Sequence, residues 1–90
     1  MVSARATVLN RLGLHARPAM AFVQLANQFR ATVSLRRDDS DEMIDGKSIM
    51  QMLLLAATQG TELEIECDGP DADAALAELV RLVESRFDEE

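Results

Sequence analysis

Polar and apolar residues alternate in several short stretches of this 90-residue chain. This alternation, which is typical of strands with one buried face, is clear in residues 2–9, 31–36 and 62–67. Residues 43–45 are interpreted as a further short strand. Because the longer stretches each have an apolar and a polar side, we expect one face of the sheet to be covered and the other to be open.

Apolar residues at helical spacing follow three of these strands. The first helix is predicted to start near Pro18 and to run to residue 28 or 29, and the second to run from Ser48 to about residue 57. The third follows Asp71 or Asp73, either of which can cap it. Its apolar face is Leu76, Leu79, Val80, Val83 and Phe87.

The element order is therefore βαββαβα. It predicts an α/β (α+β) fold of the open-faced β-sandwich type, with a four-stranded antiparallel sheet and three helices on one face. Ninety residues suffice for one hydrophobic core, so we expect a single domain spanning residues 1–90.

Charge and composition exclude several classes of function. A formal net charge of −7 opposes nucleic-acid binding and favours partners with basic surfaces. The single cysteine, Cys67, cannot form an internal disulfide and is expected to be a buried, inert thiol. With no apolar stretch long enough for a bilayer and no visible secretion signal, we expect a cytoplasmic protein without membrane insertion.

The only histidine, His15, precedes the first predicted helix. Pro18 suits the first turn, and Ala16, the expected cap, has no side-chain oxygen for the free backbone amides. The amides of Ala16 and Arg17 and the helix dipole are then available to an anion, which the Arg17 guanidinium can also bind. A nucleophilic imidazole beside an anion site suits a phosphorylated histidine, although a lone histidine more often has no chemical role.

Two motifs make the pattern recognisable. Residues 13–19, Gly-Leu-His-Ala-Arg-Pro-Ala, resemble the active-site motif of HPr, the histidine-containing phosphocarrier family of the bacterial phosphotransferase system. Residues 46–50, Gly-Lys-Ser-Ile-Met, resemble the family's second signature, around its regulatory serine. Both occur in a chain of the right length and element order, so the resemblance covers residues 2–87.

The resemblance implies a phosphoryl carrier with no turnover of its own, and therefore not an enzyme. His15 would accept a phosphoryl group on Nδ1 from Enzyme I, which phosphoenolpyruvate charges, and pass it to an Enzyme II A-type acceptor. Arg17 would neutralise the phosphate during the transfer. The family's chemistry requires no metal and no cofactor on this protein, and we expect it to act as a monomer.

Ser48 has two interpretations. By resemblance it matches the serine that HPr kinase/phosphorylase modifies in many members. Ser48 and Gln51 also have the spacing of a capping box, in which the serine caps the helix and the glutamine reaches back to it. A cap contributes about 1 kcal/mol without any regulation, and both roles can coexist because a helix N-terminus tolerates a phosphate.

The second helix is apolar nearly all round, which is more than one sheet face can bury. We therefore expect an exposed apolar patch beside His15, and methionines suit a surface that accepts several partners. By resemblance, the contacts for Enzyme I and its acceptors are Met20, Gln24, Ile49, Met50 and Leu53. The alternative is that these residues only fill the core.

The branch of the family and two rival functions stay open at this point. Residues 10–13 and 87–90 resemble the nitrogen-related branch, NPr, whereas residues 46–50 resemble members regulated on serine. One rival is a regulatory binding module controlled through Ser48, against which His15 and Arg17 argue. The other is a small metabolite-binding domain, but the chain has no glycine-rich loop to support it.

Overall fold

Four strands form one antiparallel sheet in the computed structural model, which describes residues 1–88. In chain order they are β1 (Val2–Thr7), β2 (Thr32–Arg37), β3 (Ile44–Asp45) and β4 (Glu62–Asp68). Their order across the sheet is β1-β4-β2-β3, so the last strand lies between the first two. The predicted antiparallel sheet is therefore confirmed.

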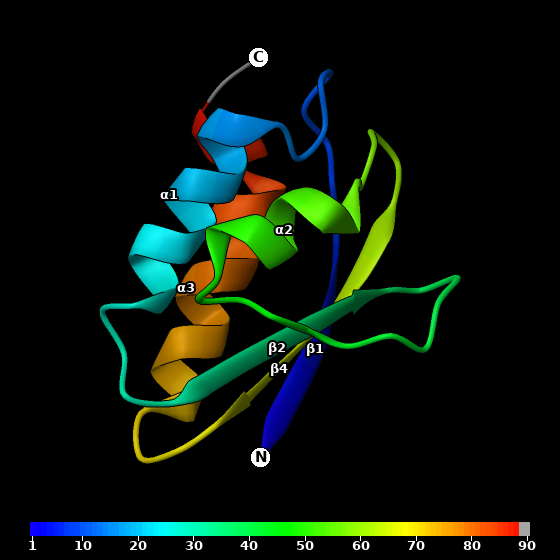
Figure 1. Ribbon diagram of the computed structural model, residues 1–90. Helices are drawn as coiled ribbons and strands as arrows, with labels where there is room; N and C mark the ends of the chain where they lie inside the picture. The colour runs from blue at the N-terminus through cyan, green and yellow to red at the C-terminus, as the bar shows by residue number, and fades with distance from the viewer. Residues whose placement is uncertain (89–90) are drawn as a thin grey trace.

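Three helices cover one face of this sheet, as Figure 1 shows. They are α1 (Ala16–Ala26), α2 (Ile49–Leu55) and α3 (Ala72–Glu84), and a short 3-10 turn, η1 (Arg86–Asp88), follows α3. Helix α3 packs against β1 and β4, and α1 packs against both α2 and α3. No helix within residues 1–88 has the length and apolar character needed to cross a membrane.

The opposite face of the sheet is polar and open. Arg5 of β1 forms an ion pair with Glu62 of β4 at 3.2 Å, and Arg36 of β2 forms one with Glu64 at 2.6 Å. Such a face has no apolar surface to bury, so the helices lie on the other side only. The open-faced sandwich expected from the alternation is confirmed.

The core lies between the helices and the inward side chains of the strands. Leu63, Ile65 and Cys67 of β4 are completely buried, together with Phe22 of α1 and Leu79 of α3. Burial of Cys67 raises the pKa of its thiol, so this side chain stays protonated and acts as a small apolar group. The expectation of a buried cysteine is confirmed.

Two helix ends differ from the prediction. Helix α1 ends at Ala26, because the amides of Gln28 and Phe29 bond three residues back, at 3.0 and 3.2 Å, in a tightened turn. Helix α2 ends at Leu55, where Ala56 adopts a left-handed conformation with φ of 54°. In each case the apolar pattern continues past the last helical residue, so the predicted helix is longer than the one in the structure.

The apolar face of α3 is also shifted from the predicted one. Leu79, Val83 and Phe87 are buried as expected, but Phe87 follows the end of the helix. The predicted residues Leu76 and Val80 are only half-buried, whereas the small side chains of Ala72 and Ala75 are buried. Residues 89 and 90, part of the NPr-like ending, lie outside the described residues.

Candidate functional site

His15 occupies the N-cap position of α1, with extended backbone angles (φ −82°, ψ −171°). Its carbonyl accepts the first helical hydrogen bond, from the amide of Ala19 at 3.0 Å, and the helix therefore starts at Ala16. The expectation that Ala16 is the cap was wrong by one residue. Its consequence is unchanged, because the side chain of His15 makes no capping hydrogen bond to the first turn.

The first turn of α1 presents backbone amides outward. The amides of Ala16 and Arg17 precede the first helical donor, which is the amide of Ala19 bonded to the His15 carbonyl, and Pro18 has no N–H. Within the described chain this turn contains no acidic residue that would compensate the helix dipole. Arg17 is exposed and His15 is half-buried, so the same turn carries a permanent cation and an imidazole.

A buried asparagine shapes the loop that leads to His15. The side-chain Nδ2 of Asn10 donates to the carbonyl of Gly13 at 2.6 Å, and the Gly13 amide donates to the Asn10 carbonyl at 3.1 Å. Asn10 is the one polar side chain in the buried part of the described structure. Sequence reasoning missed this residue, for which the only local signal was an asparagine three positions before a glycine.

Gly13 brings this loop against the end of α2. Its φ is +68°, and a Cβ added there would lie 2.4 Å from the carbonyl oxygen of Ala57. The next residue, Leu14, donates its amide to that same oxygen at 2.9 Å and is itself buried in the core. Glycine is therefore required both for the backbone conformation and for the close approach.

Ser48 caps the other end of α2. Its Oγ accepts a 3.3 Å hydrogen bond from the amide of Gln51, as the capping-box spacing predicted. The reciprocal bond differs, because the Gln51 side chain accepts from the amide of Asp45 at 2.8 Å. The Ser48 amide instead donates to the Asp45 carbonyl at 3.2 Å. This bond takes the place of the one that the Gln51 side chain would accept in a capping box.

The two motifs therefore lie at opposite ends of α2. The loop before His15 is bonded to Ala57 beyond the C-terminal end, whereas Ser48 is at the N-terminal end. A helix of seven residues is about 10 Å long, so the structure does not bring His15 and Ser48 together at one site.

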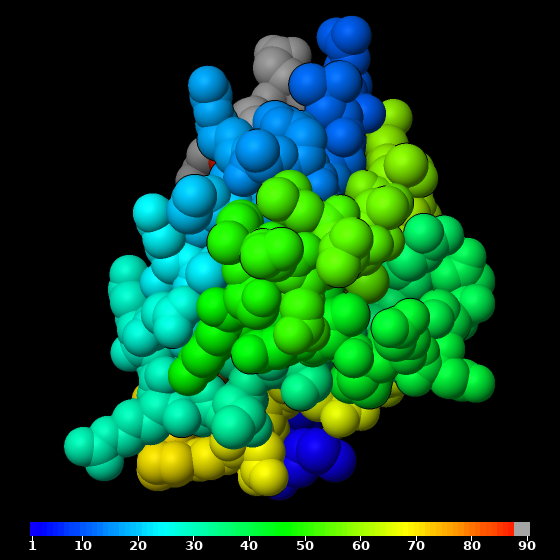
Figure 2. All heavy atoms as spheres, viewed as in Figure 1, coloured from blue at the N-terminus to red at the C-terminus, as the bar shows by residue number. Residues whose placement is uncertain are grey.

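Most of the expected partner-contact residues are exposed on α1 and α2, which pack side by side. Met20, Met50 and Leu53 are 46%, 72% and 43% exposed, and Gln24 is also at the surface. Ile49 is half-buried against the core and contributes less to the surface. Figure 2 shows the first turns of α1 and the atoms of α2 next to each other on one face.

Metal ligands are not gathered at this or any other place in residues 1–88: no group of three histidine, cysteine, aspartate or glutamate side chains is suitably arranged. The chemistry that the site offers is therefore that of an imidazole, an arginine and two backbone amides at a helix N-terminus. This set suits an anionic group bound to the imidazole.

Comparison with known proteins agrees with this geometry. A family model described as the PTS HPr component phosphorylation site matches residues 2–85. The chain belongs to the HPr family. Its relatives in this family are phosphocarrier proteins of the phosphotransferase system, so the resemblance noted in the two motifs is confirmed.

Individual relatives carry both names used in the family. The chain is 45% identical over 83 residues to phosphocarrier protein HPr of Pseudomonas aeruginosa, covering 92% of this chain and 91% of that protein. It is 40% identical over 83 residues to phosphocarrier protein NPr of Escherichia coli K12, with the same coverage. These similarities assign the family without choosing between its two branches.

A solved structure supports the fold over the whole chain. A crystal structure of HPr from Thermoanaerobacter tengcongensis is similar, with a TM-score of 0.93 and 37% sequence identity. The similarity covers 100% of this chain and 99% of that one. The arrangement of sheet and helices described above is therefore that of an HPr phosphocarrier.

Proposed function

We propose that this protein is a cytoplasmic histidine phosphocarrier that accepts a phosphoryl group from phospho-Enzyme I on His15 and transfers it to Enzyme II A-type acceptors. In the first transfer, the bond from phosphorus to Enzyme I breaks as the bond to Nδ1 of His15 forms. In the second, the bond from phosphorus to Nδ1 breaks as a bond to the acceptor side chain forms. The protein is then a substrate of phosphotransferases and not an enzyme.

The observation that carries this proposal is the position of His15 at the start of α1. A phosphoryl group on the imidazole adds negative charge next to the positive end of the helix dipole and the outward amides of Ala16 and Arg17. Phosphoryl transfer depends mainly on alignment and charge compensation, so an exposed, prearranged anion site supplies most of what it needs.

Arg17 is proposed to bind the phosphate during transfer. Its guanidinium is exposed beside His15 and can donate two parallel hydrogen bonds to phosphate oxygens. A cation in the first turn of a helix opposes the dipole, and this unfavourable placement is offset when an anion is bound between them.

The exposed side chains of Met20, Gln24, Met50 and Leu53, with Ile49 at their edge, are proposed to contact Enzyme I and the acceptors. They lie on the two helices next to the His15 loop, where a partner that reaches the imidazole would cover them. Flexible methionine side chains let one surface fit several partners in turn.

Ser48 is proposed as a regulatory phosphorylation site for a kinase of the HPr kinase/phosphorylase type. It is half-buried at the N-terminus of α2, beside the proposed contact residues Ile49 and Met50. A phosphate there adds close to two negative charges to the contact surface without removing a hydrogen-bond acceptor from the cap. The second candidate, a regulatory module that signals through its phosphorylation state, uses these same residues.

The decisive experiment incubates the purified protein with Enzyme I and radiolabelled phosphoenolpyruvate. We expect a label that is labile in acid and stable in base, present in Ser48→Ala and lost in His15→Ala. Arg17→Ala should slow labelling about tenfold or more, because a charge donor to the transferred group is lost. An unlabelled wild-type protein would overturn the carrier role, and a label stable in acid would place the phosphate on serine instead.

A further inference from the structure

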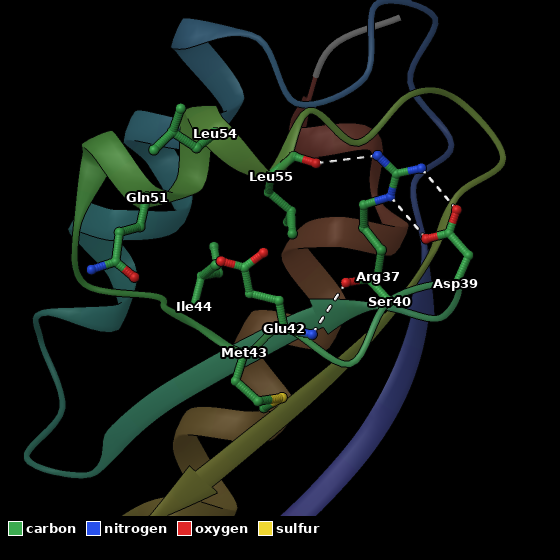
Figure 3. A pocket seen from close by; sticks show the side chains of 9 residues that line it. All are labelled: Arg37, Asp39, Ser40, Glu42, Met43, Ile44, Gln51, Leu54 and Leu55. Atoms are coloured by element: carbon green, nitrogen blue, oxygen red, sulfur yellow. Dashed lines mark hydrogen bonds and ion pairs between the residues drawn. The ribbon is translucent and has the colours of Figure 1, made fainter.

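A groove of about 470 Å³ lies on the side of α2 that faces away from α1. Residues at the end of β2, in the loop of residues 38–43, in β3 and in α2 form its walls. Figure 3 shows the side chains that line it. The groove is separate from the His15 loop, none of whose residues contributes to the lining.

Arg37 holds one end of the groove in place. Its Nη2 and Nε donate to the two carboxylate oxygens of Asp39 at 2.9 and 3.1 Å, and its Nη1 donates to the carbonyl of Leu55 at 3.4 Å (Figure 3). The guanidinium beside Asp39 also lowers the pKa of that carboxyl. The side chain of Arg37 thus joins the loop to the last turn of α2, and both walls are preformed.

The interior of the groove is apolar, and its rims are exposed. Leu55 and Ile44 line the interior, Leu55 being nearly fully buried. On the α2 rim Leu54 is 79% exposed, and on the loop rim Met43 is 39% exposed. The groove is therefore bordered by exposed apolar side chains from both walls, which form an unfilled apolar contact surface.

The loop rim of the groove is strongly acidic. Residues 38–45 contain five carboxylates and no lysine or arginine. Of these carboxylates, Asp39 and Glu42 line the groove; Asp39 is paired with Arg37, and within residues 1–88 Glu42 takes part in no ion pair. A basic occupant would therefore be attracted to the groove and an acidic one repelled.

A second copy of the chain is a poor occupant, because each copy carries a net charge of −7 and the same acidic rim. A metal ion is also a poor one, since no ligand cluster is found in the described chain. We propose that the groove docks a basic and apolar segment of a partner protein, with an apolar side chain between Leu54 and Met43 and an arginine or lysine facing Glu42.

This site differs from the contact surface assigned above to Enzyme I. Leu53 and Gln51 lie on different sides of α2, whereas Met50 and Leu54, four residues apart, are neighbours on its exposed face. Leu53 and the residues of α1 do not line the groove, so a segment can occupy it without covering them. The inference therefore does not depend on phosphoryl transfer at His15.

The test is a titration of the isotope-labelled, full-length protein followed by nuclear magnetic resonance. The probe is a synthetic peptide of eight residues that alternates arginine and leucine, and the comparison peptides replace arginine by glutamate or leucine by alanine. We expect saturable shifts of the amide signals of Glu42, Gln51 and Leu54 with the first peptide only. Binding should weaken as salt is raised, because the rim charges are exposed.

Two variants locate the binding. Glu42→Lys and Leu54→Ser should each weaken peptide binding about five- to tenfold, since one reverses a rim charge and the other removes the apolar rim. Glu84→Lys, on α3, makes the same change of charge away from the groove and should stay within about twofold of wild type.

Four results would overturn the proposal. One is shifts confined to Leu53 and α1, and another is equal binding of the acidic peptide. The third is no saturable binding of the arginine–leucine peptide up to about 1 mM. Concentration-dependent self-association of the wild-type protein, weakened by Leu54→Ser in analytical ultracentrifugation, would assign the groove to a second copy and also overturn it.

Discussion

The side chain of Asn10 is bonded to the carbonyl of Gly13 at 2.6 Å, two residues before His15. The amide of Gly13 donates to the carbonyl of Asn10, so two hydrogen bonds between these residues close a tight turn. Because Asn10 is completely buried, the turn is fixed from inside the protein. The backbone that leads to His15 thus depends on a residue outside the proposed anion site.

We predict that Asn10→Ala destabilises the protein and slows labelling of His15. The substitution leaves the Gly13 carbonyl without its side-chain donor, a loss that costs about 1–3 kcal/mol at a buried site. Urea denaturation measures the free energy of unfolding, and the initial rate of labelling by phospho-Enzyme I measures transfer under conditions where the variant is folded. A variant with wild-type stability and rate would show that the turn forms without this side chain.

Gly13→Ala should be more damaging than Gly60→Ala. Both glycines have positive φ, +68° and +92°, and an alanine in this conformation costs about 1–3 kcal/mol. Only at Gly13 would the new methyl group also collide with the Ala57 carbonyl, whereas nothing lies within 4 Å at Gly60. Urea denaturation of both variants should give a larger loss for Gly13→Ala, and equal losses would contradict the close approach.

Asp71 joins the start of α3 to the loop before β2 and should make stability depend on pH. Its carboxylate accepts the amides of Arg30 and Ala31 at 2.9 and 2.8 Å, and these bonds lower its pKa in the folded protein. The stabilisation is fully present above the unfolded pKa of about 3.9 and is lost as pH falls through the lower, folded value.

We therefore expect Asp71→Asn to lower the melting temperature at pH 7 and to flatten its decline in acid. Thermal unfolding followed by circular dichroism from pH 7 to pH 2 measures both effects. Asp73→Asn is the matched control, because it removes a carboxylate from the first turn of the same helix without touching the bonds to residues 30 and 31. Identical acid profiles of the wild type and Asp71→Asn would refute the linkage.

Local patterns were enough to predict most of the fold. The alternation in β4 gave the buried face correctly because strand period and one-sided burial are properties of neighbouring residues. The partners of Asp71 could not be predicted in this way. Their amides lie 41 and 40 positions earlier in the chain. Asp71, one of the two residues expected to cap α3, does occupy the N-cap position, but its side chain makes no capping bond.

The residues of the candidate site likewise fall into those that local sequence predicts and those that depend on the tertiary fold. His15, Arg17 and Ser48 are adjacent to helix starts that the sequence marks clearly, and the structure places each of them at such a start. Asn10 was missed because its role depends on complete burial under the loop. The groove beside α2 was also beyond sequence reasoning, since it exists only where the 38–43 loop folds back toward Leu54.

Substitutions of Ser48 can separate its structural role from its regulatory one. Ser48→Ala removes the acceptor for the Gln51 amide and should cost about 1 kcal/mol in urea denaturation while leaving the rate of His15 labelling nearly unchanged. Ser48→Asp and Ser48→Asn both keep a good cap, but only the aspartate adds charge. We expect the aspartate variant alone to be labelled slowly, and equal rates for the two would argue against charge-based regulation.

Met50 provides the most direct test of the surface proposed to contact Enzyme I. Its side chain is 72% exposed, so Met50→Ser should change the melting temperature little. If Enzyme I covers this residue, the loss of apolar contact should raise the KM for this protein about five- to tenfold in steady-state labelling, with a smaller effect on kcat. Met50→Leu is the matched control. It keeps the apolar volume, so its KM should be near the wild-type value.

An unchanged KM in Met50→Ser would remove Met50 from the contact surface. A KM that is raised in Met50→Leu as well would mean that the methionine is needed for something other than its apolar area.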